Sequence, residues 1–196
     1  QSNSMEVNNY PITTQGGKSG ATPTHNLVSA YEYIGTPDPT DPYANRDPRL
    51  AASIVTNGST WNGRVIDQSA GGSDDMAKAN ASRTGYYLKK FLTDNLNLTQ
   101  GQTAQHNWVA YRWAEVLLNY AEAMNEAYGP DAVPAGFAMS AREALQQVRN
   151  RASINLPEVT ATDVASFRKA VKHERRIELA FEDHRYWDLI RWKDAM

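Results

Sequence analysis

The chain has 196 residues, of which 41% are hydrophobic, so it can build one core or two small lobes. Its formal net charge of −2 argues against a nucleic-acid-binding protein, which would normally carry a basic face. The sequence holds no apolar run of about 18 residues, so no membrane-spanning helix is predicted, and it has no cysteine, which excludes disulfides, Cys-ligated zinc and thiol catalysis.

Glycine and proline punctuate residues 1–105, which show little helical periodicity, so this half is predicted to be rich in loops. One short helix is expected at 26–33 with Thr24 as its N-cap. The many aromatic residues of 1–105 favour an ordered, ligand-facing surface over disorder. Short strands are predicted at 49–57, at 61–66 as its hairpin partner across Asn57-Gly58, and at 85–91.

Helical spacing of apolar residues begins at Asn107 and predicts four helices, at 107–128, 140–152, 163–181 and 185–194. The first is expected to end at Gly129-Pro130, and Ser140 with Glu143 forms a capping box for the second. The first two resemble a tetratricopeptide-like hairpin. The predicted class is therefore mainly α, with a tetratricopeptide-like α-α superhelix element in 106–196 and a large loop-rich N-terminal half, 1–105, containing short strands.

The charged end of the chain predicts a partly buried ion-pair network. On a helix, Glu174, Glu178 and Glu182 would line one face, within reach of Arg175 or Arg185. Such networks specify geometry better than they stabilise it. Glu178, Glu182 and His184 could in principle bind a metal, but the abundant arginine favours ion pairs.

Catalytic motifs fail on inspection, so no enzyme activity, metal or cofactor is expected. Gly17-Lys18-Ser19 lacks the first glycine of a phosphate-binding loop, because Ile12 stands there. His173-Glu174 lacks the second histidine of a zinc protease, because Ile177 stands there. Glu115 and Glu122 lie two turns apart, but a glycosidase pair is defined across the sugar. Ion pairs of these two with Arg112 and with an arginine such as Arg149 are preferred.

An acidic loop offers oxygen ligands at close spacing from Asp38, Asp41, Asn45 and Asp47. Calcium uses such ligands, but the glycine and closing glutamate of an EF-hand are missing. A turn held by Asx hydrogen bonds, with Asp47 bonded to Arg49, is the preferred interpretation.

Four runs are similar to motifs of the SusD/RagB family, in that family's order: DPRL at 47–50, TGYYLKKF at 84–91, YRWAEVLLNYAEAMNEAYG at 111–129 and ERRIELAFEDHRYWDLIRW at 174–192. The matching residues, with Arg149 and Arg151 between the last two runs, resemble scaffold positions of the family and not ligand contacts. The resemblance covers the chain from about residue 23 to its end.

The resemblance implies a surface lipoprotein of the bacterial outer membrane. Such a protein would bind oligosaccharides or polysaccharides without cleaving them and pass them to a SusC-like TonB-dependent transporter. The chain begins at Gln1 and shows no signal peptide, and the family's chains are much longer. An N-terminal half that carries the lipid-bearing cysteine is therefore expected outside this chain, which would have no other membrane contact and no nucleic-acid partner.

A sugar site has to be predicted from chemistry. Sugar binders offer exposed aromatic planes beside amides, carboxylates and guanidinium groups. Trp61 lies in a Gly/Asn-rich turn beside Asn62 and Arg64 and is the first candidate for a stacking platform. Alternatively, Trp61 packs beneath the loop as a core residue. Further candidates are Tyr43 beside Asn45, and Asp74 in the Gly71-Gly72 loop.

Two other functions stay open at this point. The helices could form a protein-interaction scaffold with no sugar site of its own. A glycoside hydrolase that uses Glu115 and Glu122 is the third possibility, and it would release reducing sugar.

Overall fold

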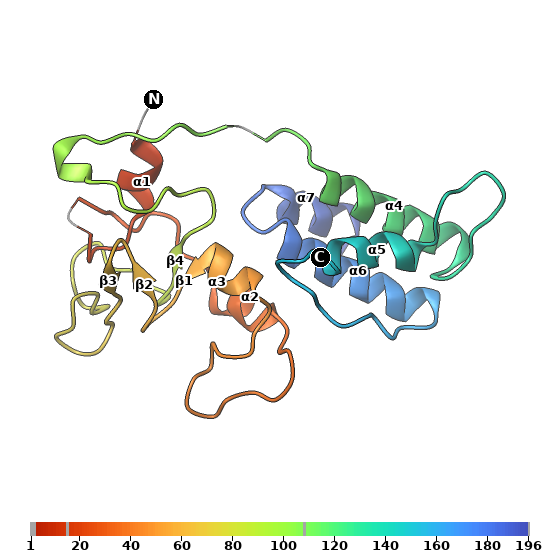
Figure 1. Ribbon diagram of the computed structural model, residues 1–196, viewed down its shortest axis with the longest axis horizontal. Helices are drawn as coiled ribbons and strands as arrows, with labels where there is room; N and C mark the ends of the chain where they lie inside the picture. Colours follow the sequence, from red (N-terminus) through yellow and green to blue (C-terminus); the bar gives the residue numbers. More distant parts are fainter. Residues whose placement is uncertain (1–2, 15, 108, 196) are drawn as a thin grey trace. The chain divides into compact units, whose positions relative to one another are not determined.

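The computed structural model describes residues 3–14, 16–107 and 109–195, and the chain forms two units (Figure 1). Unit 1 comprises 1–31, 38–44 and 50–108, and unit 2 comprises 32–37, 45–49 and 109–196. Helices dominate the regular structure, which confirms the predicted mainly α class. Among the described residues, no helix combines the length and the apolar content needed to cross a membrane.

Short elements joined by loops make up unit 1: α1 (Ser4–Asn9), α2 (His25–Ala30), α3 (Arg49–Ser53, whose first residue belongs to unit 2), β1 (Ile54–Val55), β2 (Thr60–Trp61), β3 (Arg64–Val65), β4 (Tyr87–Leu88) and the 3₁₀-helix η1 (Leu98–Gln100). The predicted helix near residue 26 is confirmed as α2, and its Thr24 hydroxyl accepts the N–H of Leu27. The predicted strand at 85–91 is confirmed as β4.

The predicted pairing of the other strands is wrong. β1 pairs antiparallel with β4, and β2 pairs with β3, so the hairpin turns at Asn62-Gly63 and not at Asn57-Gly58. Both turn residues are left-handed, with φ of 49° and 72°, which Asn-Gly accepts in a two-residue hairpin. The predicted strand at 49–57 begins instead as helix α3. Asp47 Oδ1 accepts the N–H of Arg49 at 2.9 Å, which caps the start of that helix.

The core of unit 1 forms where these short elements meet. Six buried residues make it: Tyr10, Val55, Trp61, Ile66, Tyr87 and Leu98. The rings of Tyr10 and Trp61 meet edge to face, with centroids 5.2 Å apart. Burial raises the pKa of Tyr10 to about 12. The aromatic residues of this half therefore include a packed core.

The described residues of unit 2 form four helices, drawn in green to blue in Figure 1: α4 (Trp113–Tyr128), α5 (Ala141–Arg149), α6 (Val164–Glu178) and α7 (His184–Arg191). α4, α5 and α6 share one hydrophobic core, built around Leu118, Leu145 and Phe167. The predicted end at Gly129 is confirmed by its φ of 85°. The capping box of Ser140 and Glu143 is confirmed as well.

The predicted ranges of all four helices extend beyond the observed bounds at one or both ends, and for α4 a tertiary contact holds the preceding residue in an extended conformation. α4 begins at Trp113 and not at Asn107; Trp108, within the predicted range, lies outside the described residues. Arg112 precedes α4 in an extended conformation, with its guanidinium bound to Glu178 and Glu182. α6 ends at Glu178, and Phe181 has a left-handed φ of 66°.

Candidate functional site

A polar pocket of about 280 Å³ lies entirely within unit 1. One wall comes from the β2–β3 hairpin and the other from the segment 95–99, with Thr14 between them in the lining. The described residues that line it are Thr14, Asn62, Arg64, Asn95, Leu96, Asn97, Leu98 and Thr99. Three amides, two hydroxyls and a guanidinium group thus face one small volume.

Asp94 ties the two walls of the pocket together. Its Oδ1 accepts the backbone N–H of Asn62 at 2.8 Å and that of Asn95 at 2.7 Å. Both asparagines have left-handed φ, 49° and 66°, a conformation that asparagine tolerates better than most residues. The hairpin turn is therefore fixed to the facing segment by a charge-assisted bond.

Asn97 shapes the second wall by capping η1. Its Oδ1 accepts the N–H of Gln100 at 3.1 Å and the hydroxyl of Thr99 at 2.8 Å. Leu98, in the same segment, is buried in the core cluster that contains Trp61. The core of unit 1 thus supports the pocket from beneath.

The expectation that Trp61 presents an exposed ring is wrong. Trp61 is 1% exposed, whereas its neighbour Thr60 on β2 is exposed. Alternate residues of a strand point to opposite faces, and Trp61 takes the inward position against Tyr10. The alternative, that it packs beneath the loop, is the one that the structure shows. Its neighbours Asn62 and Arg64 do line the pocket, so the prediction that they bind a ligand stays open.

The other predicted site residues are not in the pocket lining. Tyr43, in unit 1, is half-buried and lies edge-on to Tyr86. Asn45, in unit 2, is exposed and donates its amide to the carbonyl of Thr36 at 3.0 Å.

Asp74 was expected on a ligand-facing loop, but it is fully buried. Its Oδ1 accepts the N–H of Thr13 at 3.2 Å, and its Oδ2 accepts the Ser73 hydroxyl at 2.9 Å. Because Thr13 precedes a pocket residue, Asp74 has a structural role in positioning that segment. A carboxylate satisfied by local donors is stable in such a buried place.

Residues 95–99 were missed by sequence reasoning. The run NLNLT alternates polar and apolar residues, which is a signal for one exposed and one buried face. Leu96 and Leu98 face the core cluster of unit 1, and the polar residues between them stay exposed. Nothing in the run itself indicates that it faces Asn62 and Arg64.

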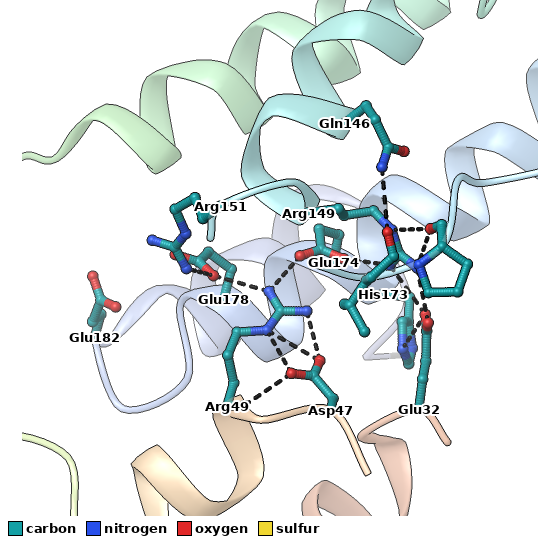
Figure 2. A network of polar contacts seen from close by, with 12 residues as sticks. Glu32, Asp47, Arg49, Gln146, Arg149, Arg151, His173, Glu174, Glu178 and Glu182 are labelled. Carbon is teal, nitrogen blue, oxygen red and sulfur yellow. Dashed lines mark hydrogen bonds and ion pairs between the residues drawn. The ribbon is translucent and has the colours of Figure 1, made fainter. Parts of the chain in front are cut away.

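The predicted ion-pair network exists within unit 2, where it is mostly buried (Figure 2). Arg49 binds Asp47 through two nitrogens and also contacts Glu174 and Glu178. Arg149 lies 2.8 Å from Glu174. The same arginine binds Glu32 at 2.9 Å, so the network joins segments 32–37 and 45–49 to the helices of unit 2.

The predicted partners within this network are wrong. Instead of Arg175 or Arg185, the glutamate row is bound by Arg49, Arg112, Arg149 and Arg151. Arg175 pairs with Asp188 of α7 at 3.0 Å. Glu182 lies beyond the end of α6 and binds Arg112 at 2.7 Å. These partners lie far apart in the chain, where helical spacing gives no information.

The two carboxylates considered for glycoside hydrolysis are also engaged, though not by the expected arginines. Glu115 lies 3.6 Å from His184 Nε2, and not against Arg112. Glu122 accepts hydrogen bonds from Arg191 and from the indole of Trp192, the latter at 2.8 Å, and not from Arg149. All three partners belong to α7 or to Trp192, the residue that follows it.

The acidic loop forms Asx turns, as expected. Asp38 Oδ1 accepts the N–H of Thr40, and Asp41 Oδ1 accepts the N–H of Tyr43, both at 2.8 Å. Asp47 is bound by Arg49. In the part of the chain that the structure describes, no group of three or more histidine, aspartate or glutamate residues is arranged to hold a metal ion.

Acidification is expected to weaken unit 2. Burial by itself raises the pKa of Glu178, but hydrogen bonds from Arg112 and Arg49 outweigh it and lower the pKa below 4.5. Because the pKa is lower in the folded state, this contribution to stability is complete above about pH 4.5 and is lost as the pH falls through the folded pKa. Urea unfolding between about pH 7 and pH 3 measures this loss.

The Glu178→Gln variant is the control for this pH dependence. It should be less stable at pH 7 and should lose less stability on acidification, because the titrating carboxylate is absent. If both proteins lost the same stability on acidification, Glu178 would not contribute to the pH dependence.

Comparison with known proteins gives one consistent result. The sequence model of the SusD family matches residues 1–196. SusD-like protein P25 of Formosa agariphila is 32% identical over 161 residues, which are 73% of this chain and 29% of that protein. SusD-like protein P2 of the same organism is 30% identical over 155 residues, 76% of this chain and 28% of that protein. The chain thus spans less than a third of the length of these curated relatives.

Solved structures give the same result. A SusD-like carbohydrate-binding protein of Bacteroides fragilis superposes with a TM-score of 0.75 at 34% identity, over 91% of this chain and 36% of that one. A second SusD-like protein of that species superposes with a TM-score of 0.77 at 30% identity, over 96% of this chain and 40% of that one.

Proposed function

This chain belongs to the SusD family, and on that basis we propose that it binds oligosaccharides or polysaccharides without cleaving them. The family match over residues 1–196 carries the proposal, and one of the similar solved structures is described as carbohydrate-binding. Because the chain spans under a third of its curated relatives, the proposal concerns the share of binding that this region contributes.

The pocket of unit 1 supplies chemistry suited to this task. Its amides and hydroxyls can donate to and accept from sugar hydroxyls, and the half-buried Leu96 offers apolar contact to C–H faces. None of the described residues in its lining is a carboxylate, whereas glycoside hydrolysis ordinarily needs two. The pocket therefore supports binding and not bond cleavage.

The contacts of Glu122 argue against the hydrolase alternative. Burial raises its pKa, but hydrogen bonds from Arg191 and Trp192 outweigh that effect, so its pKa is lowered. A glycosidase acid needs a raised pKa to carry its proton at neutral pH. Glu122 is instead a charged structural partner of α7.

Family membership also supports a cellular role. The proposed setting is the outer-membrane surface, where the full-length protein would be lipid-anchored and would deliver glycan to a SusC-like TonB-dependent transporter. The scaffold alternative is favoured by one observation: the exposed aromatic side chains of unit 2, among them Tyr111, Trp113, Tyr186 and Trp187. Such a surface suits contact with another protein or another part of a longer chain.

Affinity gel electrophoresis tests the binding proposal. The chain should be retarded in gels containing at least one polysaccharide of a broad panel. Asn62→Gly should weaken retardation about two- to tenfold, since one neutral hydrogen bond contributes roughly 0.5–1.5 kcal/mol. Glycine fits the left-handed φ of Asn62 without strain.

Asn80→Gly is the matched control, because Asn80 is exposed in unit 1, has a φ of 62° and is not in the pocket lining. It should migrate like the unchanged chain. Failure of every polysaccharide to retard the chain would reject the proposal for this region. Release of reducing sugar during incubation would revive the hydrolase.

A further inference from the structure

Arg64 is the one charged residue among the described residues that line the unit 1 pocket. It is exposed on β3, and its Nη1 donates to the carbonyl of Thr13 at 3.2 Å. A carbonyl orients the guanidinium group without neutralising its charge. Among the residues that the structure describes, Arg64 forms no ion pair with a carboxylate.

The surroundings of Arg64 differ from those of the arginines in unit 2. Arg49 and Arg149 are each bound by at least two carboxylates within the network of Figure 2. Those two guanidinium groups have a structural role, and carboxylates of the protein itself neutralise their charge. The guanidinium fork of Arg64 still has N–H donors that can bind a planar carboxylate or a sulfate.

Asp94 precedes the pocket residue Asn95 in the chain, but its carboxylate does not pair with the guanidinium group of Arg64. Asp94 is absent from the lining, and its Oδ1 already accepts the N–H groups of Asn62 and Asn95. The described part of the lining therefore carries one positive charge and no negative one.

Thr14 provides a second, independent observation. It lines the pocket, is only 7% exposed, and its Oγ1 has no hydrogen-bond partner among the described residues. A buried hydroxyl without a partner costs free energy, so a water or ligand group that reached it would be bound favourably. The hydroxyl of Thr14 is thus a hydrogen-bonding group at this pocket that the described residues leave unsatisfied.

We propose that this pocket selects an anionic sugar unit. Arg64 would bind its carboxylate or sulfate, and the amides of Asn62, Asn95 and Asn97 would bind its hydroxyls. This inference rests on the proposed glycan binding and adds the chemical class of the ligand. A charge-assisted hydrogen bond is about twice as strong as a neutral one, so an anionic unit gains most from Arg64.

Two matched pairs of polysaccharides test the charge preference and separate its sources. Polygalacturonate is compared with its fully methyl-esterified form, and dextran sulfate with dextran, using this chain in affinity electrophoresis or titration calorimetry. The anionic member of at least one pair should bind about tenfold tighter or more, which corresponds to roughly 1.4 kcal/mol. The preference should fall with added salt, because the site is solvent-exposed.

Variants connect the preference to Arg64. Arg64→Gln should abolish it, while Arg64→Lys should keep part of it, because lysine retains the charge but not the planar fork. Arg83→Gln is the control: Arg83 is exposed in unit 1 and not in the lining, and its loss changes net charge equally. Circular dichroism of each variant checks the fold.

The outcomes separate this inference from the proposed function. Equal binding of charged and neutral members, or an unchanged preference in Arg64→Gln, overturns the anionic specificity and leaves glycan binding intact. Equal loss in Arg83→Gln also overturns it, because the effect would then be general charge attraction. Binding to none of the four polysaccharides, nor to a broad neutral panel, rejects both. The pair that shows the preference identifies carboxylate or sulfate.

Discussion

Glu174→Ala is expected to lower the free energy of unfolding of unit 2 by about 3–5 kcal/mol, the cost of breaking a buried ion pair by removing one partner. The Glu174 side chain is 1% exposed and is shared by Arg49 and Arg149. Its removal leaves both guanidinium groups buried with fewer counter-charges. The loss is large because desolvation of these groups is no longer compensated.

Urea unfolding followed by circular dichroism measures this loss. Glu126→Ala is the matched control, because Glu126 pairs with Arg168 on the exposed surface of the same unit. An exposed pair contributes about 0–1 kcal/mol, so this control should change stability little. Similar losses in the two variants would contradict a special role for the buried network.

Trp61→Ala is expected to lower the free energy of unfolding of unit 1 by about 3–5 kcal/mol, as for other large-to-small changes in a packed core. The side chain is almost fully buried against Tyr10, and the same cluster holds Leu98, a pocket residue. A cavity at this place removes support from beneath the pocket. Glycan binding should therefore fall as well, through loss of structure and not through loss of a stacking contact.

Trp61→Phe separates these two effects. It keeps an aromatic ring in the core, so most of the stability and the glycan binding should remain. Trp187→Ala, at a tryptophan of α7 that is 66% exposed, should change stability by less than about 1 kcal/mol. If Trp61→Phe keeps the fold, measured by thermal unfolding, but loses glycan binding, then Trp61 contacts the ligand directly and the structural interpretation is wrong.

Local signals in the sequence determined much of the helical half. The capping box of Ser140 and Glu143 and the helix end at Gly129 were both predicted and are both present. Each depends on a side chain or a backbone conformation within about four residues of a helix end. The same holds for the family motifs, which are contiguous runs.

Only the tertiary structure decided which distant residues meet. Asn-Gly occurs at two places, and the one that turns the hairpin follows from β1 pairing with β4. Arg49 was correctly assigned to Asp47, two residues away, but its bonds to Glu174 and Glu178 cross more than a hundred residues. A charged side chain can satisfy its burial with any partner of opposite charge, so the sequence does not specify which one.

The candidate site is also a feature that only the tertiary structure decided. Asn62 and Arg64 were chosen for their chemistry and do line a pocket, but the facing residues 95–99 and Thr14 come from other parts of the chain. Trp61 was judged by its polar neighbours, whereas its orientation follows from strand alternation and the position of Tyr10. The residue types in the chain thus define which chemistry is available. Packing between distant segments decides which of these groups line the same pocket. Contacts between residues far apart in the chain leave no signal in the sequence around either residue.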